Sequence, residues 1–267
     1  AGTALWQRDL SSLRRASGAI SDLEAAVKAD PTLVTAWLSL GLVYEQLPGL
    51  LGGSTRKALK CAESLRKVNR PRGDLLEGTV LTMAGRWQEA EPIFLRALAA
   101  TSGDSEIVFG YLDALGSREV REALGTTEQK RRLLKEARRL QPFVRTSSRG
   151  VEAISEALLQ AGSGEEAWSV VKDSLPQTEA PSLLRLQLGK VAARAGIHRE
   201  EALAALDQAI REPLEGGSGG YASAYWRKGQ ILRALGRKVE ARNAAQSALQ
   251  WDPNHPGANK LEKELAQ

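Results

Sequence analysis

The sequence predicts an all-helical protein built from stacked helix-turn-helix units, because the chain repeats itself. Residues 248–253 read Ala-Leu-Gln-Trp-Asp-Pro and residues 26–31 read Ala-Val-Lys-Ala-Asp-Pro, so two distant units close in the same way. Between such endings lie paired helical patterns of a few dozen residues, a period typical of helical repeat proteins. A unit of this size buries its apolar face only against its neighbours, so we expect one core along the stack.

The composition fits such an array and excludes a membrane-spanning protein. Of the 267 residues, 42% are hydrophobic and 26% are charged, as in soluble globular proteins. No apolar run reaches the roughly 18 to 20 residues that span a bilayer. Residues 1–6 lack the basic and apolar regions of a signal peptide. We therefore expect a soluble protein and favour the cytoplasm, with the bacterial periplasm open if a signal peptide was removed.

We expect the whole chain, residues 1–267, to form a single solenoid of about six or seven helix pairs and a last helix. The expected repeats span residues 1–32, 33–70, 71–102, 103–145, 146–180, 181–215 and 221–254, followed by a capping helix over 256–265. The first repeat is degenerate, as end repeats often are. The glycine-rich residues 215–220 are expected to form a flexible linker before the last repeat.

The clearest unit is the last complete one. Its first helix is expected to end at Gly236, since glycine is the preferred residue just after a helix. Its second helix carries Ala241, Ala245 and Ala248 on one face, at helical spacing. These small side chains let two helices approach closely, and Pro253 then stops the second helix.

Two units depart from this plan. Residues 47–54 lengthen the turn of the second unit, and Ser54 is well placed to cap the helix that follows. In the fourth unit the first helix is expected to end at Gly116. Residues 117–125 are then extra, and a second helix is expected over residues 127–140.

This pattern resembles the tetratricopeptide repeat, in which the first helix carries a large residue and, four positions later, a small one. Trp37 and Gly41 match that pair, and alanines line the second helices as in the family. Further matching positions are Leu40, Tyr44, Gly78, Leu81, Gly85, Trp87, Ala90, Phe94, Ala97, Leu158, Gly162, Ala167, Leu188, Gly189, Gly196, Ala202, Leu206, Ala209 and Gly229. The resemblance covers nearly the whole chain. It implies a right-handed superhelical array, an α-solenoid whose first helices line a concave groove.

The resemblance also places candidate ligand-binding residues on the first helices. Carried over unit by unit, these are Leu38, Leu42, Glu45, Leu75, Thr79, Thr82, Glu152, Glu156, Lys190, Arg194, Trp226, Gln230 and Arg233. The expected groove is apolar at its N-terminal end, acidic in the middle, and basic near the C-terminus. Lys190, Arg194 and Arg233 could form charge-assisted bonds to a carboxylate. Trp226 is either an aromatic anchor for a ligand or a core residue between repeats.

The positive charge of the chain is local. Residues 118–149 carry ten Lys or Arg and four Asp or Glu, a net charge of +6, whereas the whole chain totals +5. One helix there is expected to present a basic surface made of Arg131, Arg132, Lys135, Arg138 and Arg139. Such a surface is either a solvated outer face or a contact for an acidic segment, an anionic surface or nucleic acid. Since no aromatic residue interleaves with this stripe, nucleic acid is not favoured.

The sequence around each motif that suggests a catalytic or metal site lacks what that site needs. We therefore expect no enzyme, no metal site and no cofactor. Ser218 lies among glycines, with Asp252 and His255 following in hydrolase order, but a nucleophile elbow needs a buried strand before the serine. The one cysteine, Cys61, and two histidines are too few for a typical zinc site. Cys61 lies in a run rich in Ala and Leu and is expected to be a small buried side chain.

The sequence therefore predicts a non-catalytic scaffold that binds a peptide or protein segment, one with an acidic group, in its concave groove. One alternative is a basic adaptor that meets nucleic acid or an anionic surface through residues 118–149. A second alternative is an accessory repeat region of a larger enzyme or of a secretion or envelope assembly.

Overall fold

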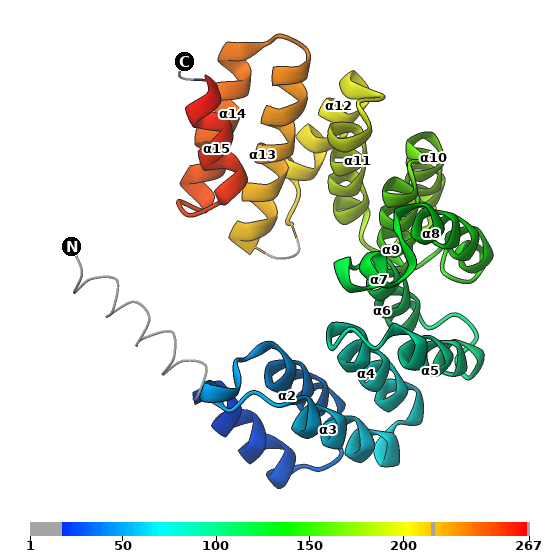
Figure 1. Cartoon of the computed structure of the whole chain (residues 1–267). Helices are drawn as coiled ribbons and strands as arrows, with labels where there is room; N and C mark the ends of the chain where they lie inside the picture. Colours follow the sequence, from blue (N-terminus) through cyan, green and yellow to red (C-terminus); the bar gives the residue numbers. More distant parts are fainter. Residues whose placement is uncertain (1–17, 215–216, 266–267) are drawn as a thin grey trace. The chain divides into compact units, whose positions relative to one another are not determined.

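The computed structural model describes residues 18–214 and 217–265, except for the side chains of residues 217 and 218. Every regular element within these residues is a helix, which confirms the all-helical prediction (Figure 1). The chain divides into two compact units, residues 1–129 and residues 130–267. The union of the two units into a single solenoid stays a prediction.

The first unit is a series of antiparallel helix pairs that opens with helical residues 18–29. Its further elements are α2 (Val34–Gln46), the short 3-10 helix η1 (Gly49–Leu51), α3 (Thr55–Val68), α4 (Arg70–Met83), α5 (Trp87–Ala99), α6 (Ser105–Leu115) and α7 (Arg118–Leu124). Helix α2 packs on α3 and α4 packs on α5, while α4 also contacts α2 and α6. The first helices of successive pairs therefore touch, as stacked repeats require.

The second unit repeats this arrangement, and α8 (Thr126–Leu140) crosses the boundary between the units. It contains η2 (Gln141–Phe143), α9 (Ser148–Ala161), α10 (Gly164–Ser174), η3 (Leu175–Gln177), α11 (Pro181–Ala195), α12 (Arg199–Arg211), α13 (Gly217–Ala234), α14 (Lys238–Trp251) and α15 (Pro256–Leu265). Helices α9, α11 and α13 contact one another in succession. Helix α15 buries Ala258 and Leu261 against α13 and α14, as expected of a capping helix.

Several helices begin or end at the residues that the local sequence signals predicted. The Ser54 side chain accepts a hydrogen bond from the backbone N–H of Lys57 and caps α3. Gly116 follows the last residue of α6, and Gly236 after α13 has a positive φ of 78°. The extra residues of the fourth unit form the short helix α7, which is capped by Ser117.

The prediction of a flexible linker over residues 215–220 was wrong for the part that the structure describes. Residues 215 and 216 lie outside the described residues, and helix α13 begins at Gly217. The start of this helix is anchored by Tyr221, whose hydroxyl donates to the Glu212 carbonyl and whose ring stacks on Trp251. These contacts offset the roughly 1 kcal/mol that each glycine costs in a helix. Trp251 is nevertheless 46% exposed, so it packs on one face only.

Small residues let the paired helices approach closely. Ala241, Ala245 and Ala248 of α14 are all fully buried. A Cβ atom added at Gly229 of α13 would lie 3.1 Å from the Ala241 carbonyl oxygen. At Gly73 an added Cβ would lie only 2.6 Å from the backbone N and Cα of Arg66. The crossing of α3 and α4 therefore depends on glycine at residue 73.

We expect Gly73→Ala to lower the free energy of unfolding by about 1–3 kcal/mol, because backbone atoms must shift to admit the methyl group. Gly41→Ala should cost less, since its Cβ would meet the movable Cδ2 of Leu76 at 2.7 Å. Gly219→Ala is the control, because nothing lies within 4 Å of its Cβ position. Urea denaturation of the three variants measures their free energies of unfolding. Equal stability of Gly73→Ala and Gly219→Ala would contradict this packing.

A buried carboxylate ties three helices of the first unit together. Asp74 of α4 is 1% exposed and accepts hydrogen bonds from Arg66 of α3, at 2.9 Å, and Arg96 of α5, at 2.8 and 2.9 Å. Burial acts to raise the pKa of Asp74, but the hydrogen bonds and charges of Arg96 and Arg66 outweigh it. The pKa is therefore held below its ordinary value.

We expect Asp74→Asn to lower the free energy of unfolding by about 2 kcal/mol at neutral pH, because hydrogen bonds to a charged group are lost. Since the folded-state pKa of Asp74 is depressed, its contribution is complete above the unfolded-state value of about 3.9 and fades as the pH falls through the folded-state value. The gap between variant and wild type, measured by chemical denaturation, should thus narrow below about pH 4. A gap that is constant down to pH 2 would refute this role.

Candidate functional site

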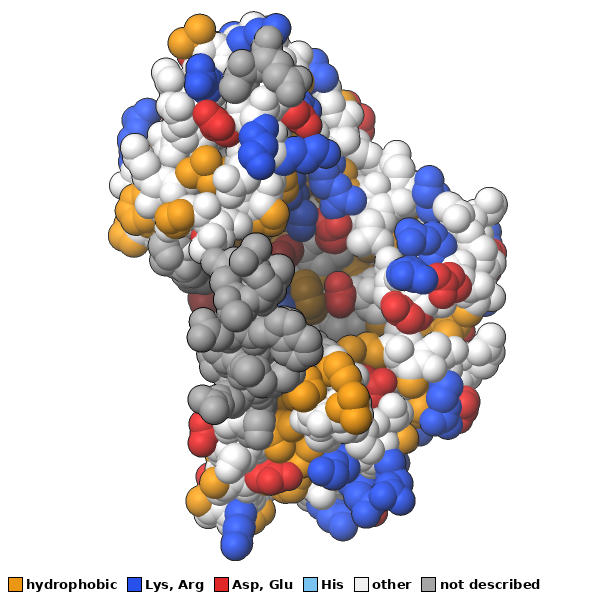
Figure 2. All heavy atoms as spheres, turned by 60° about the vertical axis from the view of Figure 1, so that its left-hand side comes forward, with side chains coloured by type: hydrophobic (Ala, Val, Ile, Leu, Met, Phe, Trp, Pro, Cys, Tyr) orange, Lys and Arg blue, Asp and Glu red, His pale blue; other side chains and the backbone are white. Residues whose placement is uncertain are grey.

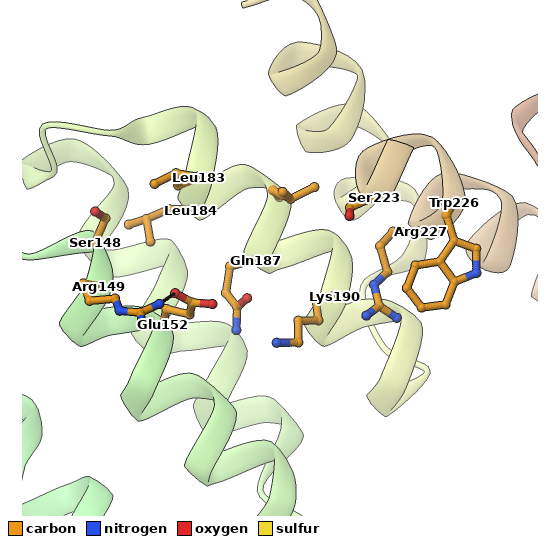
Figure 3. Close-up of a pocket in the computed structure, with 11 residues that line it drawn as sticks. Ser148, Arg149, Glu152, Leu183, Leu184, Gln187, Lys190, Ser223, Trp226 and Arg227 are labelled. Atoms are coloured by element: carbon orange, nitrogen blue, oxygen red, sulfur yellow. Dashed lines mark hydrogen bonds and ion pairs between the residues drawn. The ribbon is translucent and has the colours of Figure 1, made fainter. Parts of the chain in front are cut away.

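A cavity of 570 Å³ lies in the second unit, on the first helices of three successive pairs. We call it the second-unit cavity. Its lining comes from α9, α11 and α13 and comprises Ser148, Arg149, Glu152, Leu183, Leu184, Leu186, Gln187, Lys190, Ser223, Trp226 and Arg227. Figure 3 shows the polar side chains in a row from Arg149 and Glu152 through Gln187 and Lys190 to Arg227, with the leucines to one side.

Hydrogen bonds and close packing hold these helices in place. The hydroxyl of Ser147 accepts the backbone N–H of Gly150 and caps α9. Pro181 begins α11, a position where the missing N–H has no helical partner to lose. Between the helices, the Gln187 side-chain amide donates to the Ser155 hydroxyl at 2.9 Å, and both residues are buried. This buried bond sets the register of α11 against α9.

Two carboxylates of α9 are held by cations. Arg149 lies 3.1 Å from Glu152, and Lys190 Nζ lies 2.8 Å from Glu156 Oε2 without the alignment of a hydrogen bond. Arg194 donates to the other oxygen of Glu156. Burial acts to raise the pKa of Glu156, but the interactions with Lys190 and Arg194 outweigh it, so that its pKa is lowered. Glu156 is therefore ionised and joins α9 to α11.

Arg227 is the unusual cation of this site. Its guanidinium stacks over the Trp226 ring at 3.9 Å from the ring centroid, and Nη1 donates to the Gln230 side chain at 2.9 Å. Among the described residues, no carboxylate forms an ion pair with Arg227. Burial, together with the nearby charge of Arg194, lowers the pKa of Arg227 to about 10. Arg227 is half-buried and thus keeps a partly desolvated positive charge at the cavity.

Trp226 contributes to both the cavity and the packing of the capping helix. It lines the cavity beside Arg227. Its indole also lies against Gly257 of α15, where any Cβ atom would collide with the ring, and 4.9 Å from the His255 ring. One part of the Trp226 ring is therefore available to a ligand, and another part packs in the core. The two alternatives, ligand anchor and core residue, are compatible.

The structure brings together part of the predicted site. Glu152, Lys190 and Trp226 line the cavity, and Glu156 and Arg194 adjoin it through their ion pairs. The other two predicted residues of this unit play different parts. Gln230 accepts the hydrogen bond from Arg227, and Arg233 pairs with Glu264 of α15.

Sequence reasoning missed several lining residues, chief among them Arg149, Gln187 and Arg227. A usable signal was present, because Leu183, Gln187 and Lys190 recur at the i, i+4, i+7 spacing of one helix face. Ser223 and Arg227 continue such a face on α13. The prediction on α13 named Trp226, which lines the cavity, but not its neighbour Arg227.

The candidate residues of the first unit mainly serve packing. Leu38 and Leu42 lie against its buried core. Leu75 is buried and faces Gly110 of α6, where an added Cβ would strike it. The hydroxyls of Thr79 and Thr82 donate to carbonyls one turn earlier in α4. Glu45 is half-buried, and its Oε2 has no hydrogen-bond partner among the described residues.

The predicted basic surface lies on α8. Arg131, Lys135, Arg138 and Arg139 are exposed there, and Arg132 is half-buried. Acidic residues neutralise part of this surface. Arg138 pairs with Glu166 at 2.9 Å and Arg139 pairs with Glu136 at 2.6 Å. On the molecular face that Figure 2 shows, Lys and Arg side chains are likewise interspersed with Asp and Glu.

None of the helices that the structure describes combines the length and apolar character needed to cross a membrane. Within the same residues, we find no group of three His, Cys, Asp or Glu side chains that could hold a metal ion.

Comparisons with known proteins agree with the helix pairs. Two family models match, both described as tetratricopeptide repeat, over residues 52–105 and 222–255. Comparison with curated protein sequences finds no match.

Solved structures of similar fold cover most of the chain. A tetratricopeptide repeat protein from Parabacteroides merdae is 14% identical, with a TM-score of 0.54 over 97% of this chain and 96% of that one. Yeast Tom70 is 13% identical, with a TM-score of 0.56 over 95% of this chain and 51% of that one. A thermophilic protein of the same repeat class from Thermus thermophilus is 24% identical, with a TM-score of 0.51 over 73% and 98%. At these identities the likeness shows the fold alone.

We expect Arg227→Met to leave the melting temperature unchanged or to raise it. Arg227 is half-buried, and a partly desolvated guanidinium without a carboxylate partner carries a desolvation penalty that a methionine of similar volume avoids. Arg66→Met is the matched comparison, because Arg66 pairs with both Asp74 and Glu77, and this variant should melt lower. Thermal unfolding, followed by circular dichroism, measures the melting temperatures of the wild type and both variants. A clear loss of stability in Arg227→Met would mean that Arg227 serves the fold rather than the cavity.

Proposed function

Because the chain is a tetratricopeptide-repeat protein, we propose that it is a protein-interaction scaffold whose second-unit cavity binds a partner segment carrying an acidic group and an apolar side chain. Stacked helical repeats offer extended surfaces suited to such binding. The proposal assigns no catalytic residue. It keeps Lys190 and Trp226 from the predicted site and adds Arg227, which the geometry supplies.

The observation that carries the proposal is Arg227 itself. Arg227 is half-buried, and a cation that loses part of its hydration is normally paired, since desolvation is costly. Here the guanidinium faces a cavity and has only Trp226 and Gln230 as neighbours in described contacts. An acidic group entering the cavity would supply the missing partner. Lys190, which also lines the cavity, would add a second charge-assisted bond.

The rest of the lining suits an apolar side chain. Leu183 and Leu184 of α11 stand on one side of the polar row, and the Trp226 ring lies at its far end (Figure 3). Leu186 of the same helix also lines the cavity. Burying a leucine-sized side chain against such a wall contributes about 1.5–3 kcal/mol. The cavity thus offers one apolar and one cationic subsite on adjacent helices.

Selection from a library of displayed random peptides tests the proposal directly. We expect the selected segments to share an Asp, a Glu or another acidic group and a large apolar residue. Trp226→Ala and Lys190→Gln should each weaken a selected peptide by about 2 kcal/mol or more, because an aromatic anchor and a desolvated charge pair are lost. Binding is measured by fluorescence anisotropy of the labelled peptide.

Arg233→Ala is the matched control for these variants. Arg233 lies on the same helix as Trp226, but it pairs with Glu264 and does not line the cavity. It should bind like the wild type. If Trp226→Ala also binds like the wild type while Leu38→Ala is impaired, the partner segment lies on the first unit and the proposal fails.

A further inference from the structure

The charges on the three helices of the second-unit cavity do not balance. Nine charged residues lie on α9, α11 and α13: Arg149, Glu152, Glu156, Arg185, Lys190, Arg194, Arg227, Lys228 and Arg233. Four of the cations have an acidic partner of their own, namely Glu152, Glu212, Asp207 and Glu264. The remaining Lys190, Arg194 and Arg227 share a single carboxylate, Glu156.

The excess positive charge is therefore +2, and it is concentrated at one end of the cavity. Glu156 is already engaged by Lys190 and Arg194, so it offers Arg227 only a longer-range attraction. Arg194 lies close enough for its charge to act against that of Arg227. Three cations around one carboxylate repel one another, and the repulsion is stronger where water is excluded. A ligand with two negative charges would balance the group.

A phosphoryl group has the charge and the shape that this end of the cavity lacks. It carries about −1.5 to −2 at pH 7 and presents three acceptor oxygens. The planar guanidinium of Arg227 matches two of these oxygens, and the Lys190 ammonium serves as a point charge. The Ser223 hydroxyl, on the same helix as Arg227, also lines the cavity and can donate a hydrogen bond. A single carboxylate would leave one positive charge uncompensated.

We propose that the acidic group bound in the second-unit cavity is a phosphoryl group on a partner segment, held by Arg227 and Lys190. This inference rests on the proposed function of the same cavity and names the class of ligand. The neighbouring leucines then receive an apolar side chain of the phosphorylated segment.

Two small probes that share an apolar group but differ in the charge of their anionic group test this assignment. We use 1-naphthyl phosphate, a dianion at neutral pH, and 1-naphthoate, a monoanion, titrated calorimetrically into the full chain. At pH 7.5 the phosphate should bind at least about tenfold more tightly, because it satisfies both excess charges. Arg227→Met and Lys190→Gln should each remove that advantage. Arg233→Met, on the same helix but paired with Glu264, should keep it.

The pH dependence gives an independent readout. The second pKa of a phosphomonoester is about 6, so the advantage of the phosphate should fade as the pH drops from 7.5 to 5. His255 lies beside the Trp226 ring, at 4.9 Å between ring centroids, while the lowered pKa of Glu156 keeps that carboxylate charged. The naphthoate titration measures any effect of His255, since naphthoate stays ionised and occupies the same cavity.

The outcomes separate this inference from the proposed function. Equal affinity for the two probes, lost in Arg227→Met, overturns the phosphoryl assignment and leaves the acidic-segment proposal standing. Phosphate binding that is unchanged in Arg227→Met and Lys190→Gln marks adventitious anion binding and also overturns the assignment. If neither probe binds, both the assignment and the proposed cavity fail.

Discussion

The close contact between the first helices of successive pairs is the constraint on which each unit depends. Helix α4 touches α2 and α6, and α11 touches α9 and α13, so no pair covers its own apolar face. Such contact requires small residues where these helices meet, as at Gly41, which faces Leu76 of α4, and Gly110, which faces Leu75 of α4. It also brings three first helices side by side in the second unit. The cavity there is a consequence of the same stacking that forms the core.

Polar interactions link the stacked helices and set their register, while the stacking itself depends on apolar packing. In the first unit, Asp74 links three helices and is fully compensated by Arg66 and Arg96. In the second unit, the buried bond between Gln187 and Ser155 sets the register of two helices. Both networks satisfy their buried groups, which is the usual condition for a stabilising polar contact in a core. Arg227 differs, because it is half-buried and has no carboxylate of its own among the described residues, which is typical of a site rather than of a scaffold.

Helix α15 connects the end of the array to the cavity. Gly257 allows the Trp226 ring to lie directly against this helix, and Arg233 pairs with Glu264 on it. One face of Trp226 is thereby held by packing, and Arg227 stacks on the ring. An aromatic side chain that is fixed before binding loses little conformational entropy when a ligand arrives. The capping helix thus also orders the side chains at the cavity.

The sequence by itself determined the helical class, the repeat plan and most helix ends, because periodicity, caps and glycines act locally. Ser54, Gly116 and Gly236 lie where these local rules require. The start of α13 was missed, since Tyr221 anchors it through contacts with Glu212 and Trp251 that are distant in sequence. Only the tertiary structure decided which charges share a neighbourhood. Lys190 and Arg194 could be named from the repeat pattern, but their engagement by Glu156, and the isolation of Arg227, depend on helix rotation and on spacing between helices.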